Sequence, residues 1–335
     1  MEVLIQNPGE VIRPSISSVQ IIKILTELYG LNPLEMAELI SYDDRNVHIK
    51  HSTAQLNSSI TEIWSYGYNL KILNSLESEN PNLIECGKSG KENIVRLLTF
   101  IPGQVLASSE YTIHLFNNAG NYLSELHRVM KNFHHPEFDS RQSLWSMPSF
   151  PHLTKFLYAV ENQAHVDLVR EILREFQEKV ETRYNELPKG LIHGDFNENN
   201  ILIEMPADGE VHVTGILDFA DVQFSCYAFD IAIGIMYLML ESNDVDVTHV
   251  GGHFLAGYCT QRTLDESEWE VQKICVAARF CVSLVMGLYT HSIDSKNDYA
   301  LLTNKKGWKI LERFWAVPEQ KLLDLWKNIQ TATKL

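Results

Sequence analysis

The chain has 335 residues, of which 45% are hydrophobic, so it can bury the cores of two lobes and is too apolar for a disordered protein. It carries 28 Lys and Arg against 43 Asp and Glu, and this net charge of −15 argues against nucleic acid or an anionic membrane as a main partner. Its five cysteines are odd in number and lack CxxC spacing, as expected for a reducing, cytoplasmic location.

The N-terminal part of the chain is predicted to begin with a loose arm, residues 1–14, without the composition of a signal peptide. Ser17 or Ser18 is suited to cap a helix, because a serine hydroxyl can accept a hydrogen bond from a free backbone N–H. The apolar residues that follow recur at helical spacing, and Gly30 is the expected end of this helix.

Alternation of apolar and polar residues then indicates a small sheet. We expect two strands within residues 34–50 around the polar turn 41–46, a third within 66–73 and a fourth within 95–100. Lys71 lies near the middle of the third strand, where a solvated residue at a sheet edge is the ordinary interpretation.

The rest of the chain is predicted to be mainly helical, because apolar side chains recur every three or four positions. The clearest helices are expected at residues 108–131, 166–184, 269–289 and 315–329. Arg279 interrupts the apolar run of the third, so we interpret that run as a core helix and not a membrane span. His127, in the first, is expected to be a packed structural histidine.

The most informative stretch lies between the second and third of these helices. It reads His193-Gly194-Asp195, then four residues, then Asn200 and an apolar strand, and a second apolar strand ends on Asp218. Protein kinases use this layout: a loop Asp accepts the substrate hydroxyl proton, while an Asn of that loop and an Asp after the next hairpin hold magnesium. We therefore predict Asp195 as the catalytic residue, and Asn200 and Asp218 as ligands of Mg²⁺, which prefers oxygen donors.

Two plainer interpretations of this stretch exist. It can be a strand–turn–strand with a solvated Asp195 and a capping Asn200, but two motifs must then coincide in order and spacing. A metal pair formed by His193 and Asp195 is the other, and it lacks the further closely spaced His or Cys ligands that such sites use.

The sequence HGDFNENNIL, followed by LDFADVQFSCYAFDIAI, resembles the aminoglycoside phosphotransferase and choline kinase superfamily over about Pro14 to Lys327. Within it, the two motifs are most similar to those of members that phosphorylate hydroxylysine. The resemblance implies the α+β class and a bilobal, protein-kinase-like fold. Residues 1–98 would form a small, sheet-containing, nucleotide-binding N-lobe, and residues 99–335 a larger, mainly helical C-lobe for catalysis and substrate binding.

The resemblance also implies roles for single residues. Lys71 would pair with the phosphates of the nucleotide, and Asn46 would lie in the nucleotide loop, although this loop has no glycine and a plain polar turn is equally open. Thr99 and Phe100 would form the hinge that binds the base. His193 and Asp230 would support the catalytic loop, and Asp230 can also cap the helix that follows it. These residues are expected to act in the transfer of a phosphoryl group from GTP or ATP, with Mg²⁺, to the hydroxyl of 5-hydroxylysine.

The sequence departs from the family between Lys71 and the strand at 95–100. The segment 72–94 is too short for the usual helix with a lysine-anchoring glutamate and a further strand, as if a block were missing near Glu85-Cys86 in a shortened isoform. Glu77, Glu79 and Glu85 would be the only nearby acids that could replace the anchor. Ala220 stands where kinases have the glycine of Asp-Phe-Gly.

Two alternatives therefore stay open. The chain can be a catalytically impaired, pseudokinase-like isoform, or a kinase for choline or another amino alcohol. An aromatic cage of Tyr227, Tyr237 and Tyr289 would favour choline. An amino-acid substrate would instead need an acid such as Asp221 or Glu241 for its ammonium, and a cation such as Arg279 for its carboxylate.

Overall fold

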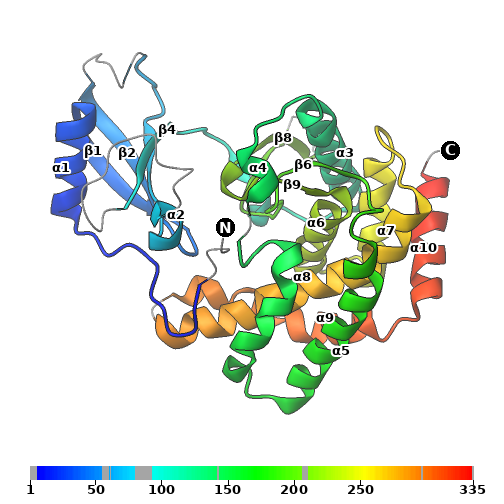
Figure 1. Cartoon of the computed structure of the whole chain (residues 1–335). Coiled ribbons are helices and arrows are strands. Elements are labelled where there is room, and N and C mark those ends of the chain that lie inside the picture. Colours follow the sequence, from blue (N-terminus) through cyan, green and yellow to red (C-terminus); the bar gives the residue numbers. More distant parts are fainter. Residues whose placement is uncertain are drawn as a thin grey trace. The chain divides into compact units, whose positions relative to one another are not determined.

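A computed structural model describes residues 6–54, 60, 62–79, 93–141, 143–205, 210–295 and 297–333 (Figure 1). The chain divides into two compact units, one that ends at Pro102 and one formed by Gly103–Leu335, which we call the sheet unit and the helical unit. The segment around Glu85 and Cys86, where a block was expected to be missing, lies outside the described residues.

The sheet unit begins with α1 (Ser18–Tyr29), which has the predicted start and end. The Ser17 side chain accepts a hydrogen bond from the Gln20 amide in a reciprocal capping box, and Gly30 ends the helix with a φ of 64°, a conformation that glycine adopts without strain. The four strands form one antiparallel sheet in chain order. They are β1 (Leu31–Leu39), β2 (Arg45–Ala54), β3 (Tyr68–Ile72) and β4 (Val95–Thr99), with the short helix α2 (Ser75–Glu79) after β3.

The core of the sheet unit lies between α1 and one face of this sheet (Figure 1). Ile21 and Leu25 of α1 are buried in one cluster with alternate residues of the central strands, Val47 and Ile49 of β2 and Leu70 of β3. Successive side chains of a strand point to opposite faces, so Lys71 lies on the face opposite to Leu70.

The helical unit contains two small sheets built from short strands. One joins β5 (Gln104–Val105), β7 (Ile201–Glu204) and β8 (His212–Ile216) in that order, and the other pairs β6 (Lys189–Ile192) with β9 (Gln223–Cys226). The chain therefore leaves β6, forms the loop 193–200, runs through the β7–β8 hairpin and returns along β9.

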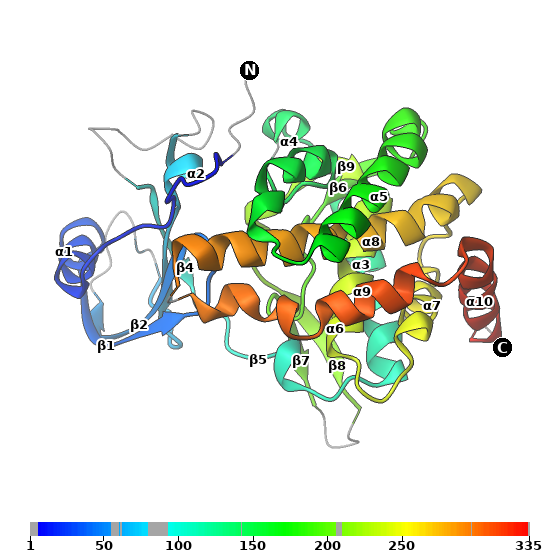
Figure 2. The ribbon, with the colours of Figure 1, turned by 90° about the horizontal axis from the view of Figure 1, so that it is seen from below.

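Helices make up the rest of this unit (Figure 1). They are α3 (Ile113–Met130), α4 (Glu137–Ser140), α5 (Gln163–Lys179), α6 (Tyr227–Glu241), α7 (Val247–Tyr258), α8 (Glu266–Ile293), α9 (Gly307–Trp315) and α10 (Glu319–Ala332), with a 3₁₀ stretch at Met147–Ala159. The long α8 packs against α5, α6 and α9, and Figure 2 shows it beside α9. Its most apolar 18-residue window is 94% buried, as expected for a core helix.

Two sequence predictions about helix boundaries are wrong. The helix expected at 315–329 is α10, which begins only at Glu319, because α9 ends at Trp315 and Pro318, which disfavours a helical residue before it, lies between the two helices. Asp230 does not cap α6, which begins at Tyr227, so that Asp230 lies inside its first turn. The carboxylate is thereby free to point at another part of the chain.

Candidate active site

The loop 193–200 is held by the pair of strands β6 and β9. Ile192 of β6 lies opposite Gln223 of β9, and the buried Leu191 and Ile192 fix the end of β6 in the core. The chain turns at Gly194, whose φ of 83° is unfavourable for other residues and where a Cβ would collide with the Asp221 carbonyl oxygen. The sequence His-Gly-Asp thus needs its glycine for the turn itself.

The carboxylate of Asp230 fixes the backbone of this loop by two hydrogen bonds. Its Oδ2 accepts the amide of His193 at 2.7 Å and its Oδ1 accepts the amide of Gly194 at 2.9 Å. His127 Nε2 lies 2.9 Å from Asp230 Oδ2, and His127 Nδ1 lies 2.8 Å from the Tyr258 hydroxyl. Burial would raise the pKa of Asp230, but the hydrogen bond from His127 and the nearby His193 hold it below its ordinary value.

The same network sets the proton positions on His127. Burial lowers the pKa of this histidine in spite of Asp230, so the ring is neutral. It then donates from Nε2 to the ionised Asp230 and accepts the Tyr258 hydroxyl proton at Nδ1. The expectation of a packed, structural His127 agrees with this geometry, since the ring acts on the loop through Asp230.

Asp195 is fixed by three side chains. Its Oδ1 accepts Arg279 Nη2 at 2.9 Å, and its Oδ2 accepts Asn197 Nδ2 at 2.7 Å and Asn200 Nδ2 at 3.0 Å. Asn200 Nδ2 also donates to the Asp195 carbonyl at 3.0 Å. A carboxylate held at both oxygens has little rotational freedom, although a quarter of its side chain remains exposed.

Arg279 is buried in the middle of α8, with 1% of its surface exposed. Its Nη1 donates to the Trp145 carbonyl at 3.0 Å and its Nη2 to the Tyr237 hydroxyl at 3.2 Å. The guanidinium carbon lies 5.5 Å from the Trp145 ring and 5.4 Å from the Tyr237 ring, within cation–π range. Arg279 is therefore committed to Asp195, and the expected alternative, that it binds a substrate carboxylate, has little support.

Asn200 and Asp218 lie at the same end of the β7–β8 hairpin. Ile201 pairs with Ile216, and the Leu217 amide donates to the Asn200 carbonyl at 2.7 Å, so both residues flank the same end of the ladder. His193 Nε2 lies 3.0 Å from the Leu217 carbonyl and ties the loop to this end. The oxygen donors of the two side chains, an amide and a carboxylate, suit a hard cation such as Mg²⁺.

Asp218 has an unusual backbone. Its φ of 59° and ψ of 74° make it the one residue other than glycine with positive φ in the described part of the chain. Its Oδ1 accepts the Ala220 amide at 3.2 Å. A strained conformation of this kind costs about 1–3 kcal/mol and persists where the surroundings enforce it, commonly at functional sites.

Two further carboxyls lie near Asp195. Burial, together with the charge of Asp195, raises the pKa of Asp221 to about 6, and burial with Glu241 and Asp195 raises that of Glu198 to about 7. Glu198 Oε2 is buried and has no hydrogen-bond partner among the described residues. Glu241 itself forms an ion pair with Lys306 at 3.4 Å. Several acidic side chains therefore lie close to Asp195 and the loop 193–200.

In the sheet unit, Lys71 is 5% exposed and forms an ion pair with Asp44 Oδ2 at 3.2 Å. Asp44 Oδ1 also accepts the Asn74 backbone amide at 2.8 Å and its side-chain amide at 3.0 Å. The plain alternative of a solvated lysine at a sheet edge is therefore excluded. The expectation that Glu77, Glu79 and Glu85 are the only nearby acids is wrong. The acid comes from the turn between β1 and β2, which the antiparallel pairing brings beside β3.

The other predicted nucleotide residues lie in the same sheet. Asn46 pairs with Lys71 in the β2–β3 ladder, and its Oδ1 is buried without a partner among the described residues. Thr99 ends β4 opposite Tyr68. Phe100 donates its amide to the Gly67 carbonyl at 3.0 Å and accepts the Trp64 indole N–H at 2.6 Å, so its backbone is already engaged.

The sequence did not identify every residue of this arrangement. The bond of Arg279 to Asp195 and that of Asp44 to Lys71 were missed, because each joins residues far apart in the chain. Asn197 was also missed. One signal in the sequence could have indicated the role of Arg279. It is a lone charged residue within an apolar helix, and a buried charge needs a partner of opposite charge.

Comparison with known proteins places this geometry in a family. The profile described as "Phosphotransferase enzyme family" matches residues 68–269. Hydroxylysine kinase of Bos taurus is 30% identical over 359 aligned positions, which cover 94% of this chain and 93% of that protein. Hydroxylysine kinase of Xenopus laevis is 29% identical over 358 positions, which cover 94% of each.

Solved structures show the same fold at low identity. A microcompartment-associated aminopropanol kinase matches with a TM-score of 0.61 and 15% identity, over 89% of this chain and 98% of that one. Choline kinase from Cryptosporidium parvum matches with a TM-score of 0.56 and 14% identity, over 92% and 98%. The predicted α+β, kinase-like fold is thus confirmed. Since the family profile spans both the lysine strand and the whole Asp195–Asp218 region, we conclude that the chain belongs to the phosphotransferase enzyme family.

Proposed function

We propose that this phosphotransferase transfers the γ-phosphoryl group of GTP or ATP to the hydroxyl of 5-hydroxy-L-lysine, in the reducing cytoplasm. The observation that carries the reaction type is the carboxylate of Asp195, fixed at both oxygens by Arg279, Asn197 and Asn200. The relatives named hydroxylysine kinase support this acceptor. Cys226, Cys275 and Cys281 are buried free thiols, as a reducing compartment would keep them.

Asp195 would orient the acceptor hydroxyl and take its proton late in the transfer. Phosphoryl transfer depends mainly on positioning and on neutralisation of charge, so a base held in one orientation is more useful than a mobile one. Oδ2 accepts two amide hydrogen bonds and Oδ1 accepts one from Arg279, so Oδ1 keeps a lone pair for the hydroxyl. Asp230 would act indirectly, because it positions the two amides that precede Asp195.

The Asn200 amide oxygen and the Asp218 carboxylate would hold Mg²⁺. The Nδ2 atom of Asn200 is used by Asp195, which orients its oxygen away from that carboxylate. Such an ion, when bound, neutralises charge on the phosphate oxygens. Lys71, held by Asp44, would bind phosphate oxygens, and Asn46, Thr99 and Phe100 are proposed to contribute to the nucleotide site.

The carboxyl groups near Asp195 favour a cationic acceptor. Asp221 and Glu198 both have raised pKa values, because each is partly withdrawn from water beside Asp195. An ammonium group bound beside either carboxyl would offset its burial and its repulsion by Asp195, and hydroxylysine carries two ammonium groups. Arg141 lies close enough to Asp221 to lower its pKa, and is a candidate partner for the substrate carboxylate.

Choline is less well supported as the acceptor. The three tyrosines that could have formed an aromatic cage pack against different partners: Tyr237 against Arg279, Tyr227 against His127, and Tyr289 against Phe156. Tyr289 is fully buried. These contacts do not place the three rings around one cation.

The chain can still be a shortened isoform. The alignment with the Bos taurus relative has 359 positions, more than the 335 residues of the chain, so it includes positions where the relative has a residue and this chain has none. The ion pair of Lys71 with Asp44 nevertheless supplies an anchor, so we propose an active enzyme and not an impaired one.

A substrate panel tests the proposal. Purified protein is incubated with Mg²⁺, either ATP or GTP, and 5-hydroxy-L-lysine, L-lysine, choline or ethanolamine, and the phosphomonoester is measured by ³¹P NMR. We expect product from 5-hydroxy-L-lysine and none from L-lysine, which matches it in charge and lacks the hydroxyl. Turnover of choline in preference to 5-hydroxy-L-lysine would contradict the proposed acceptor, and no turnover of any alcohol would contradict an active enzyme.

A further inference from the structure

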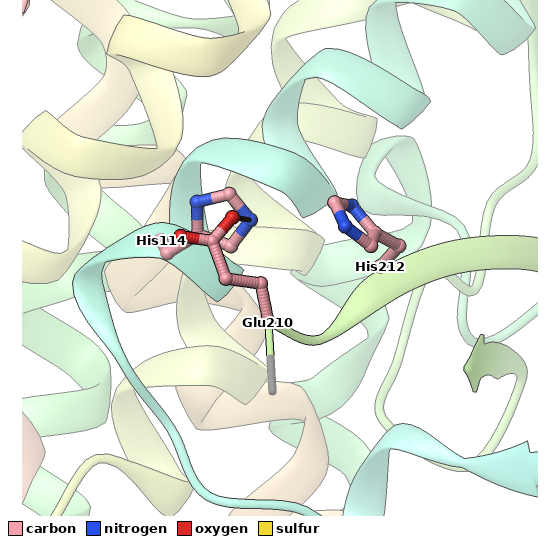
Figure 3. A group of neighbouring side chains, drawn as sticks. All are labelled: His114, Glu210 and His212. Atoms are coloured by element: carbon pink, nitrogen blue, oxygen red, sulfur yellow. Dashed lines mark ion pairs between the residues drawn. The ribbon is translucent and has the colours of Figure 1, made fainter. Parts of the chain in front are cut away.

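We propose that His114, Glu210 and His212 form a binding site for a divalent transition metal such as Zn²⁺, separate from the magnesium ligands. One donor atom of each of the three side chains lies within 4.8 Å of the other two. Figure 3 shows the Glu210 carboxylate directed at the His114 ring, with the His212 ring beside them. His114 Nε2 is 3.6 Å from Glu210 Oε2, and the centres of the two imidazole rings are 5.5 Å apart.

A separate hydrogen bond holds the elements that carry the two histidines together. His114 lies in the first turn of α3, and His212 is the first residue of β8. One turn further along α3, Asn118 Oδ1 accepts the amide of Val213, the residue after His212, at 2.6 Å. Residues four apart lie on the same face of a helix, so this bond fixes the face of α3 that carries His114 against the strand that carries His212.

The donor set determines which ions fit. Two imidazoles and one carboxylate, with a water molecule as the fourth ligand, form a common tetrahedral zinc site. At zinc–ligand distances of about 2.0–2.2 Å the donors of such a site are about 3.3 Å apart, close to the His114–Glu210 separation of 3.6 Å. Since the donor atoms lie within 4.8 Å of one another, His212 would have to move by up to about 1.5 Å, and a partly exposed side chain can do so by rotation. Magnesium prefers oxygen donors and keeps its waters, so it should bind here poorly.

A metal at this site would link α3 to the β7–β8 hairpin. His212 begins β8, and the opposite end of that hairpin carries Asn200 and Asp218. An exposed ion pair of a histidine with a glutamate contributes little by itself, whereas a metal that binds only the folded chain stabilises it by an amount that increases with the logarithm of its affinity. The site would therefore stabilise the hairpin on which the magnesium ligands lie.

The test is a zinc titration of the full, untagged chain. Isothermal titration calorimetry with Zn²⁺, and then with Mg²⁺, is carried out in the Asp218→Ala background, so that the magnesium ligands do not contribute. His114→Ala and His212→Ala remove one ligand each, and His134→Ala removes an exposed histidine outside the cluster as the matched control. Binding of Co²⁺, followed by its visible absorption, reports the ligand geometry, and circular dichroism verifies the fold of each variant.

We expect one Zn²⁺ per chain in the background protein and in His134→Ala, and an affinity at least about tenfold weaker in His114→Ala and His212→Ala. Zn²⁺ should raise the melting temperature of the background protein and leave that of the two ligand variants nearly unchanged. Absence of zinc binding, or equal binding in the ligand variants and in His134→Ala, would overturn the proposal. Equal affinity for Mg²⁺ would do the same.

Discussion

Arg279 Nη2 donates to Asp195 Oδ1 at 2.9 Å, although the two residues are 84 positions apart in the chain. The arginine lies in the buried centre of α8, and the aspartate lies in the loop after β6. A buried guanidinium holds a carboxylate in one orientation when its own position is fixed, and here Nη1 and Nη2 are fixed by the Trp145 carbonyl and the Tyr237 hydroxyl. The core helix of the helical unit is thus part of the proposed catalytic apparatus.

The first prediction concerns this pair. Arg279→Lys keeps the charge, but an ammonium cannot bond Asp195, Tyr237 and the Trp145 carbonyl in the same geometry. We expect kcat to fall about 10- to 100-fold, and to fall little further when the substitution is added to Asp195→Asn. Steady-state kinetics of the four proteins of this cycle measure the coupling.

Arg262→Lys is the control, since Arg262 bonds the buried Glu268 at 2.8 Å and has no proposed part in catalysis. It should lower the melting temperature and retain turnover. If the two lysine variants lost turnover to the same extent, the role of Arg279 would be structural only.

The second prediction concerns the metal ligands. Asp218→Ala should abolish magnesium-dependent nucleotide binding, and Asn200→Ala should raise the Mg²⁺ concentration needed for half-maximal activity, because each removes one oxygen donor. Calorimetric titrations of nucleotide at several Mg²⁺ concentrations measure both effects. Asp167→Ala, which removes an exposed acid of α5, should behave like the wild type. Unchanged magnesium dependence in both ligand variants would refute this assignment.

The third prediction concerns the anchor of Lys71. Asp44→Asn should raise the KM for the nucleotide about tenfold or more and leave the KM for the acceptor unchanged, because the lysine loses a charge-assisted bond of about 1.5–3 kcal/mol. Glu38→Gln removes the exposed partner of Arg45 in the same sheet and is the matched control. Equal nucleotide KM values in the two variants would show that another group holds Lys71.

The fourth prediction is a pH dependence. The pKa of Asp221 is raised from 3.8 to about 6 in the folded chain, so the folded state binds more protons than the unfolded state between these values, and stability falls as pH rises through this window. Asp221→Asn should therefore be more stable than the wild type above pH 6, by about 1–2 kcal/mol after allowance for solvent screening, and equal to it near pH 4.

The same substitution should raise the KM for 5-hydroxy-L-lysine, because it removes the proposed ligand of an ammonium group. Thermal unfolding at pH 4 and pH 8, together with acceptor kinetics, separates the two effects. A stability difference that does not change with pH would show that Asp221 does not titrate as expected.

The sequence predicted those parts of the fold that are determined by residues close together in the chain. Helix α1 has the expected serine cap and glycine end, and the strands around Lys71 follow the alternation of apolar residues. The spacing of Asp195, Asn200 and Asp218 could be interpreted because a loop and one hairpin join them. Asp44 and Arg279 could not be assigned, since their partners depend on strand pairing and helix packing. For Asp230 only the expected helix cap was wrong, and its bonds to the amides of His193 and Gly194 agree with the supporting role that the resemblance implied.

The most direct test of the account is the turnover of Asp195→Asn with 5-hydroxy-L-lysine and Mg²⁺–nucleotide. Asparagine keeps one oxygen that can accept the Arg279 bond, so the variant should fold with a nearly unchanged melting temperature, and it cannot accept a proton. We predict that phosphomonoester formation, followed by ³¹P NMR, falls by about two orders of magnitude or more relative to the wild type. Wild-type turnover in the folded variant would contradict the role of Asp195 and with it the proposed mechanism.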